Sequence, residues 1–366
     1  MKNLARFLLA IVGTVLLAEL MLRLLPVPGG MFAADPDPAW PVRRLVPGSP
    51  ITASFGWDLA NAHHSRVNDL GYVSPFNYVD GARAGVVIGD SYAEGLSNAE
   101  DQRLQSVVAG DLGIAQDRVY SFGTSGGSLA HYLGVAQLVG RRFRPEWATF
   151  LITARDFREG FDSEPGFYRW GTPPEVIRLV PEVHRGRVAK LVRGLALSRY
   201  LRMNLKYSLP TLFSSGLQDA PKPVCKSAVL STDDKRLLDG WVARAAAALR
   251  LPPARVVLVF DSDRSALYVP GPRTAPCPDR DTLGRAYLAQ AARAGGYQVI
   301  ETALIFAHAW AADHVPFDRS PLDAHWSPYA NKLVAAAVAA KLEHPVSPDR
   351  VTIMQAAPHR PAVESR

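Results

Sequence analysis

The chain has 366 residues, of which 48% are hydrophobic and 20% charged, proportions that are ordinary for a globular fold. That length holds either one large domain or two small ones. The net charge of +7 favours anionic surfaces only weakly. No cluster of basic residues interleaved with aromatic ones supports nucleic-acid binding, so we expect no nucleic-acid partner.

The N-terminal segment predicts a membrane anchor. Lys2 and Arg6 precede a largely apolar stretch from Phe7 to Leu25, close to the ~20 residues that a helix needs to cross a bilayer. Positive charge before the span places the N-terminus in the cytoplasm and the rest of the chain outside. A cleaved signal peptide is the alternative, but bulky Phe32 stands two residues before Ala34, so a small-x-small cleavage site is lacking and a retained anchor is favoured.

The two cysteines, Cys225 and Cys277, both lie in proline-rich stretches. An exported compartment permits a disulfide, and an even pair fits one. The alternative is two unrelated free thiols.

Strand-like and helix-like segments alternate along most of the chain. Strands are expected at 85–89, 118–123, 146–153, 254–260 and 297–301, and helices at 100–113, 128–143, 234–250, 280–296 and 327–342. Because the strands are continuous apolar runs separated by amphipathic helices, we expect an α/β fold with three α/β/α layers and a central parallel sheet covered on both faces.

Other parts of the chain do not follow this alternation. Residues 26–80, rich in proline, aspartate and glycine, predict a lead-in with little regular structure. The second half of an insertion at 157–232 is basic, with apolar residues at helical spacing. It is either a helix with an ordinary solvated face or a cap that lies on anionic lipid or attracts an anionic glycan. The domains expected are an anchor at 1–25, the lead-in at 26–80, a catalytic domain at 81–345 that contains the insertion, and a loose polar tail at 346–366.

The stretch "VVIGDSYAEG" at 86–95 delivers a serine, Ser91, to the end of a buried strand. Sites in parallel sheets form at the carboxyl ends of the strands, so Ser91 is a candidate nucleophile. The structural alternative is an ordinary turn, because glycine and aspartate are common turn residues. A nucleophilic serine needs a histidine to accept its proton and a carboxylate to orient that histidine.

Among nine histidines, His325 in "LDAHWSPYANKL" has the most favourable setting. Asp323 stands two residues before it, and Ser327 can N-cap the final helix, so His325 would be held on a short loop directly before a helix. The pair Asp313 and His314 is the rival, but it has no comparable helix start.

These residues resemble the sequence blocks of the SGNH (GDSL-type) hydrolase superfamily. "GDSYAEG" is similar to its first block, with Ser91 as nucleophile and Asp90 beside it. "SFGTSGGS" resembles the second block, in which the Gly126 amide would line the oxyanion hole. "DAHWSPYANKLVA" resembles the last block, with Asp323 and His325 completing the triad. The resemblance implies a flavodoxin-like α/β/α fold and an acyl-serine intermediate, with no metal and no cofactor.

The third block departs from the family pattern. The family has Gly-x-Asn-Asp, whose Asn donates to the oxyanion, whereas this chain reads "LITARDF". Asp156 aligns as a supporting residue, but Arg155 stands where Asn is expected. Either Arg155 donates from its guanidinium, or the oxyanion hole rests on the amides of Ser91 and Gly126 alone, or the site is catalytically weak. The structural alternative is a surface ion pair at the end of the strand.

Further stretches point to a setting for the enzyme. "RVNDLGY" and "LAELMLRLLP" resemble membrane-tethered members associated with envelope polysaccharides, and Asp-x-His-Trp is similar to domains that add or remove O-acetyl groups on bacterial exopolysaccharides. The resemblance implies an esterase or O-acetyltransferase on the periplasmic side of the inner membrane, acting on an envelope glycan, with a polysaccharide-biosynthesis membrane protein as a possible partner. The alternatives are a catalytically silent glycan-binding or assembly protein and a lipid-ester hydrolase.

Overall fold

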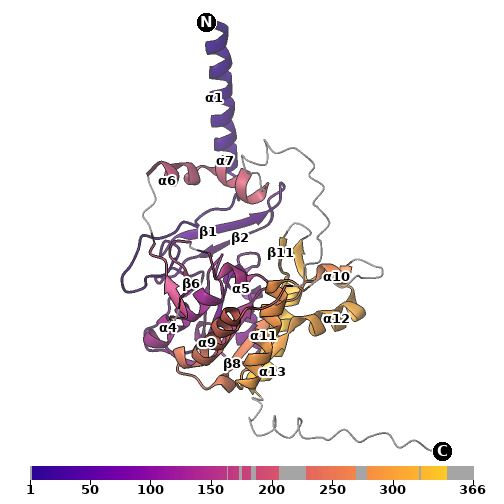
Figure 1. The fold of residues 1–366 in the computed structure, drawn as a ribbon. Coiled ribbons are helices and arrows are strands. Elements are labelled where there is room, and N and C mark those ends of the chain that lie inside the picture. The colour runs from indigo at the N-terminus through magenta and orange to yellow at the C-terminus, as the bar shows by residue number, and fades with distance from the viewer. Residues whose placement is uncertain are drawn as a thin grey trace, which may run out of the picture.

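The computed structural model describes residues 2–162, 164–172, 175–182, 187–205, 228–268, 278–320 and 323–343. The predicted α/β fold is confirmed, because a five-stranded parallel sheet lies at its centre with helices on both faces (Figure 1). The strand order is β4-β3-β5-β8-β9, and all neighbouring pairs are parallel. The strands are β3 (Arg83–Gly89), β4 (Val119–Gly123), β5 (Arg144–Ile152), β8 (Val256–Phe260) and β9 (Gln298–Glu301).

Two hydrophobic clusters, one on each face, hold the helices against the sheet. One face packs against α4 (Leu129–Arg142), α9 (Thr232–Ala248) and α11 (Arg280–Ala294). The other packs against α3 (Leu104–Asp111), α12 (Thr302–Asp313) and α13 (Pro328–Glu343). Because both faces are covered, every residue of β4 and of β8 is buried, which is why these strands read as continuous apolar runs.

The structure corrects one predicted helix and adds one that was not predicted. The helix expected at 100–113 is a 3-10 turn, Glu100–Gln102, followed by α3, because Arg103 between them is extended and its side chain is buried. Helix α12 was not predicted. Its sequence "TALIFAHAWAAD" is apolar nearly all round, so it lacks the 3.6-residue alternation that marks a helix packed on one face.

The lead-in is more ordered than predicted. Strands β1 (Pro50–Phe55) and β2 (Ala60–Arg66) form an antiparallel hairpin. Trp40 and Tyr72 are buried in the main core, and the indole Nε1 donates to the Tyr72 hydroxyl at 3.0 Å. The proline- and glycine-rich sequence revealed the turns but not these aromatic contacts, which depend on the sheet on which they pack.

Helix α1 (Lys2–Arg23) projects from the domain (Figure 1). Its segment Asn3–Arg23 has a mean hydropathy of 2.0 and is buried nowhere in the protein, so it is long and apolar enough to span a membrane. At its base, both carboxylate oxygens of Glu19 accept backbone N–H groups of α7 (Ala196–Arg199), at 3.0 and 2.9 Å. The end of α1 is therefore fixed to the domain.

The inserted segment at 157–232 contributes several short elements. Its elements are α5 (Asp156–Glu159), β6 (Tyr168–Trp170), β7 (Ile177–Leu179), α6 (Arg187–Gly194), α7 and the π-helical turn η3 (Tyr200–Asn204). The remaining elements are the 3-10 turns Gln116–Arg118 and Pro253–Arg255, helices α2 (Ser91–Glu94) and α10 (Ser265–Tyr268), and strands β10 (Asp318–Ser320) and β11 (Asp323–Trp326).

Cys225, Cys277 and the tail at 346–366 lie outside the described residues, so the disulfide stays a prediction.

Candidate active site

Ser91 lies at the carboxyl edge of the sheet, on the first turn after β3. Asp90 caps α2, with its Oδ1 accepting the Tyr92 N–H at 2.9 Å. Gly123 at the end of β4 lets α2 pack closely, because a Cβ there would come within 2.0 Å of the Glu94 nitrogen. The strand, the tight turn and the packed helix together fix the Ser91 side chain at this edge.

His325 lies on strand β11, which pairs antiparallel with β10, whereas a short loop was predicted. Ser327 Oγ accepts the Ala330 N–H at 3.3 Å, which is the N-cap contact that the sequence predicts. The rival His314 is exposed at the C-terminal end of α12, where its ring contacts the Trp310 carbonyl.

The structure brings the three predicted triad residues together. Ser91 Oγ lies 2.8 Å from Nε2 of His325, and Nδ1 of His325 lies 2.5 Å from Oδ1 of Asp323. The Asp323 side chain is 9% exposed and that of His325 is 32% exposed, so the carboxylate is shielded while the imidazole remains reachable. This is the order of contacts that a serine nucleophile, its base and an orienting acid require.

The pKa shifts in this relay favour a charged aspartate. Burial raises the pKa of Asp323, but the hydrogen bond and charge of His325 outweigh burial and hold it below its ordinary value. Burial lowers the pKa of His325, but the hydrogen bond and charge of Asp323, with the charges of Asp90 and Glu94, raise it overall. An imidazolium formed during the reaction is therefore stabilised.

This electrostatic pairing predicts the pH dependence of the site. His325 must be neutral to accept the Ser91 proton, so we expect kcat/KM for a soluble acetyl ester to fall as the pH drops through the raised pKa of His325. In Asp323→Asn the hydrogen bond and charge of Asp323 are lost while the charges of Asp90 and Glu94 remain, so the inflection moves to lower pH and kcat falls by on the order of 10³–10⁴. Initial rates across a pH series measure both effects.

A second titrating group requires a control for this experiment. Burial raises the pKa of Asp90 to about 7, although the Tyr92 amide and the His325 charge lower it. Asp90→Asn removes that titration, and the acid limb of the profile should persist because it belongs to His325, although at a lower pH, since the Asp90 charge is one of those that raise the pKa of His325. An Asp323→Asn profile whose inflection stays in place would contradict the assignment.

The predicted oxyanion donors are the backbone amides of Ser91 and Gly126 and the side chain of Arg155. Gly126 has φ of +83°, a left-handed conformation that favours glycine, in the turn after β4. Within the described chain, the amides of Ser91 and Gly126 donate no hydrogen bond to another backbone group. Arg155 occupies the N-cap position of α5, but its side chain makes no capping hydrogen bond and is 71% exposed. Its Nε lies 3.4 Å from Glu159 Oε1, as in the ion-pair interpretation. Its role as an oxyanion donor stays a prediction.

Asp156, predicted as a supporting residue, is fully buried beneath this edge. Its carboxylate accepts from the Thr153 amide at 2.8 Å, the Thr153 hydroxyl at 2.6 Å and the Tyr132 hydroxyl at 2.9 Å. Burial, followed by the charge of Asp90, raises the pKa of Asp156 well above its ordinary value. Asp156 therefore ties the end of β5 to α4. Among the hydrogen bonds that the described residues form, none joins Asp156 to Ser91.

Sequence reasoning missed several residues that hold the triad. The Ser97 hydroxyl donates to Oδ2 of Asp323 at 2.9 Å, and Asn98 donates to the Trp326 carbonyl at 2.8 Å. Buried Glu94 accepts the Ser125 hydroxyl, which joins α2 to the turn that carries Gly126. For Glu94, Ser97 and Asn98, the only signal in the sequence was their position a few residues after the nucleophile.

A second missed group lies at the end of β8. Buried Arg264 donates to the Ala324 carbonyl at 2.6 Å and to Asp318 Oδ1 at 2.7 Å. Ala324 stands between the two triad residues on β11. It also pairs with Asp261, whose Oδ1 accepts Trp326 Nε1 at 2.9 Å. Asp261 directly follows a buried strand at the carboxyl edge, and that was a usable signal.

The described part of the chain offers no evident metal site. Over the described ranges, no group of three or more His, Cys, Asp or Glu side chains could hold a metal ion. No protein-family model matches the sequence, and no curated protein matches it.

Solved structures do match. An α/β hydrolase from the metagenome of Lake Arreo, Spain, is 13% identical, covers 72% of this chain and 98% of its own, and has a TM-score of 0.39. An aryl esterase of M. smegmatis is 12% identical, with coverage of 72% and 100% and a TM-score of 0.34. A carbohydrate acetylesterase from Sinorhizobium meliloti is 14% identical, with coverage of 74% and 99% and a TM-score of 0.30. These similarities are too weak to indicate a function.

Proposed function

We propose that the chain is a serine esterase or acyltransferase of the SGNH type that acts on O-acetyl groups of an exported or cell-envelope polysaccharide. The observation that carries the proposal is the hydrogen-bonded relay from Ser91 through His325 to Asp323 at the carboxyl edge of the sheet. Helix α1 would hold the enzyme in the inner membrane, and the positive charge that precedes its apolar span favours a periplasmic catalytic domain.

The mechanism follows from the relay. Ser91 Oγ attacks the carbonyl carbon of the ester while Nε2 of His325 accepts the hydroxyl proton. The amides of Ser91 and Gly126 donate to the oxyanion of the tetrahedral intermediate. His325 then passes the proton to the departing sugar oxygen, which leaves an acyl-serine. Water or a second sugar hydroxyl attacks this acyl-serine, gives its proton to His325 and restores Ser91, with release of the acid or of the acylated sugar.

The polysaccharide part of the proposal rests on weaker support than the esterase part. It draws on the membrane anchor and on the sequence Asp-Ala-His-Trp at 323–326, which resembles O-acetyl-processing domains. The triad serves water and sugar acceptors equally, because both react with the same acyl-serine.

One observation favours the catalytically silent alternative. Arg155 replaces the usual oxyanion asparagine, and its guanidinium pairs with Glu159. Loss of one oxyanion donor typically lowers kcat by about 10²–10³. A glycan-binding protein that retains the fold would show no acetyl-ester turnover at all.

The test uses the full chain in detergent with three substrates. We expect it to hydrolyse a chromogenic acetyl ester and an acetylated oligosaccharide, and to turn over a long-chain ester more slowly. Adding an unacetylated oligosaccharide and following its mass distinguishes the transferase, which gives acetylated product, from the hydrolase. Absence of turnover with all esters would contradict an enzymatic role, and preference for the long-chain ester would favour a lipid substrate.

A further inference from the structure

A cavity of about 850 Å³ lies apart from the triad, beside the base of the anchor. Its walls come from the segment just after α1, including Phe32, and from α6, α7 and η3, including Arg193 and Arg202. None of the triad residues lines it. Its place in the fold therefore suggests a role separate from ester chemistry.

The cavity is held against the end of the anchor. Glu19 on the last turns of α1 accepts two amides of α7, and Arg199 on α7 donates to the Pro28 carbonyl at 2.9 Å. With α1 across a bilayer, this arrangement holds the cavity close to the level of the lipid headgroups.

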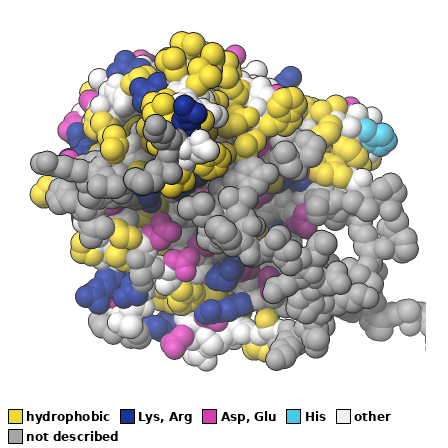
Figure 2. All heavy atoms as spheres, turned by 90° about the horizontal axis from the view of Figure 1, so that it is seen from above, with side chains coloured by type: hydrophobic (Ala, Val, Ile, Leu, Met, Phe, Trp, Pro, Cys, Tyr) yellow, Lys and Arg dark blue, Asp and Glu magenta, His cyan; other side chains and the backbone are white. Residues whose placement is uncertain are grey.

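The surface around the anchor is suited to a membrane interface. Figure 2 looks down on the end of the molecule from which α1 projects, and the hydrophobic side chains gathered there, with basic ones between them, include those of α1 itself. Leu191 on α6 is 69% exposed, and Trp57 at the β1–β2 turn is 75% exposed. The Tyr200 hydroxyl on η3 donates a hydrogen bond to the Trp57 carbonyl at 2.6 Å. Exposed tryptophan and leucine beside basic residues are typical of segments that lie at the headgroup level.

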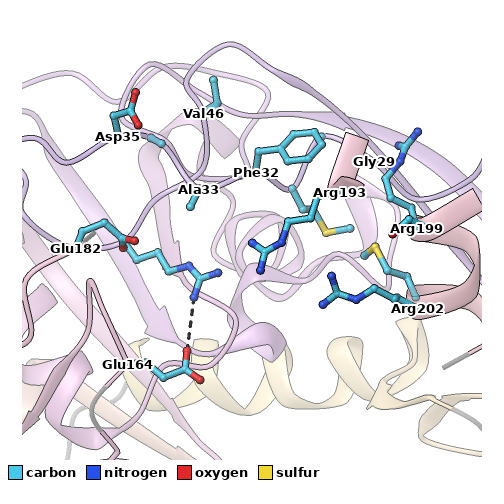
Figure 3. A pocket seen from close by; sticks show the side chains of 16 residues that line it. Gly29, Phe32, Ala33, Asp35, Val46, Glu164, Glu182, Arg193, Arg199 and Arg202 are labelled. Carbon is cyan, nitrogen blue, oxygen red and sulfur yellow. Dashed lines mark ion pairs between the residues drawn. The ribbon is translucent and has the colours of Figure 1, made fainter. Parts of the chain in front are cut away.

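The two glutamates of the cavity and three of its four arginines lie on opposite walls, and the fourth arginine, Arg43, lies beside the glutamates. In Figure 3, Arg193 and Arg202 reach in from one side, while Glu182 and Glu164 lie on the other. Arg43 lies 3.6 Å from Glu164 and so neutralises it. Among the described residues, Arg193, Arg202 and Glu182 form no ion pair, and Oε2 of Glu182 is buried with no hydrogen-bond partner.

We propose that this cavity binds the headgroup of a phospholipid that carries both a phosphate and a primary ammonium. Guanidinium groups bind phosphate oxygens in charge-assisted hydrogen bonds, so the phosphate would lie on Arg193 and Arg202. The ammonium would donate to Glu182, whose buried oxygen is costly to leave without a partner. Phe32 and Met203, both partly exposed, would contact the start of the acyl chains.

The proposal rests on the proposed membrane location but not on esterase activity. An anionic headgroup that ends in glycerol would leave Glu182 without a cationic partner. A choline headgroup has no N–H to donate to it. We therefore expect phosphatidylethanolamine to bind more tightly than phosphatidylglycerol or phosphatidylcholine of the same acyl chains.

The test is native mass spectrometry of the full, delipidated chain in detergent, titrated with each of the three lipids. Arg193→Gln with Arg202→Gln should weaken phosphatidylethanolamine binding by roughly tenfold or more. In Glu182→Gln, phosphatidylethanolamine should no longer bind more tightly than phosphatidylglycerol. Arg118→Gln with Arg144→Gln, at the opposite edge of the sheet, should leave all three affinities unchanged.

Two results would overturn the proposal. One is equal lipid retention by the Arg193 and Arg202 double variant, with a melting temperature that shows it to be folded. The other is displacement of the lipid by an equal concentration of soluble phosphoethanolamine, which would assign the cavity to a soluble phosphate ester. Turnover of a soluble acetyl ester should be the same in these variants as in the parent, so failure of the lipid proposal and failure of the esterase proposal are distinguishable.

Discussion

Ser91→Ala is expected to lower kcat for a soluble acetyl ester by on the order of 10⁴-fold or more, because no other group can form the acyl intermediate. The Ser91 hydroxyl lies 2.8 Å from Nε2 of His325, so alanine removes the nucleophile and leaves its base without a proton to accept. The remaining oxyanion donors and binding contacts would account for residual turnover. Steady-state rates of the full chain in detergent measure the effect.

A matched serine variant separates catalysis from stability. Ser231 caps α9 through the Asp234 amide, away from the triad. Ser231→Ala should cost about 1 kcal/mol of stability and leave kcat unchanged. Ser91→Ala should lower kcat and leave the stability unchanged. A phosphonate probe should label the parent on the peptide that contains Ser91. Turnover in Ser91→Ala equal to that of the parent would contradict the assignment of the nucleophile.

Local patterns in the sequence were sufficient to predict the sheet and the three side chains that meet at its carboxyl edge. The strand 85–89 is continuous and apolar, and the glycine and aspartate that follow it end the strand abruptly. Ser91 therefore had to lie at the carboxyl edge, where parallel strands place their sites. His325 was found because Ser327 marked the helix start that fixes its position along the chain. Each of these inferences depends on neighbours within a few residues.

The parts that were missed depend on contacts between distant segments. Trp40 is buried because Tyr72 and the sheet cover it, and nothing near Trp40 in the sequence shows that. Ser97 acquires its role only because Asp323, 226 positions away, lies against it. The cavity beside the anchor requires Glu19 to hold α7 in place. Spacing within a segment cannot predict such pairs.

Arg264→Met is expected to lower both stability and kcat, because one guanidinium holds the strand that carries the triad acid and base. Its side chain is 4% exposed and pairs with Asp261 and Asp318, while its Nη2 donates to the Ala324 carbonyl. Removing one partner of a buried ion pair typically costs about 3–5 kcal/mol, because the other charge remains buried. The melting temperature should fall by roughly 10 °C.

The loss of stability should also depend on pH. Burial already raises the pKa of Asp261, and the charge of Arg264 opposes that rise. Without Arg264 the folded-state pKa of Asp261 rises further above its unfolded value. An acid with a raised folded-state pKa stabilises the fold at low pH and destabilises it as the pH rises through that pKa. The deficit of Arg264→Met relative to the parent should therefore shrink as the pH is lowered, which melting curves at several pH values would show.

A positioning role for Arg264 requires an effect on rate that instability alone does not produce. Trp241 on α9 is fully buried and donates to the Leu129 carbonyl at 2.7 Å, so Trp241→Phe destabilises the fold without touching β11. At a temperature where both variants are folded, Arg264→Met should label slowly with the phosphonate probe and Trp241→Phe should label at the parent rate. Arg264→Lys keeps the charge, but its ammonium cannot reach Asp261, Asp318 and the Ala324 carbonyl at once. Compared with Arg264→Met, it should therefore restore more of the stability than of the labelling rate. Equal labelling rates in Arg264→Met and Trp241→Phe would contradict the positioning role and leave Arg264 with a purely structural one.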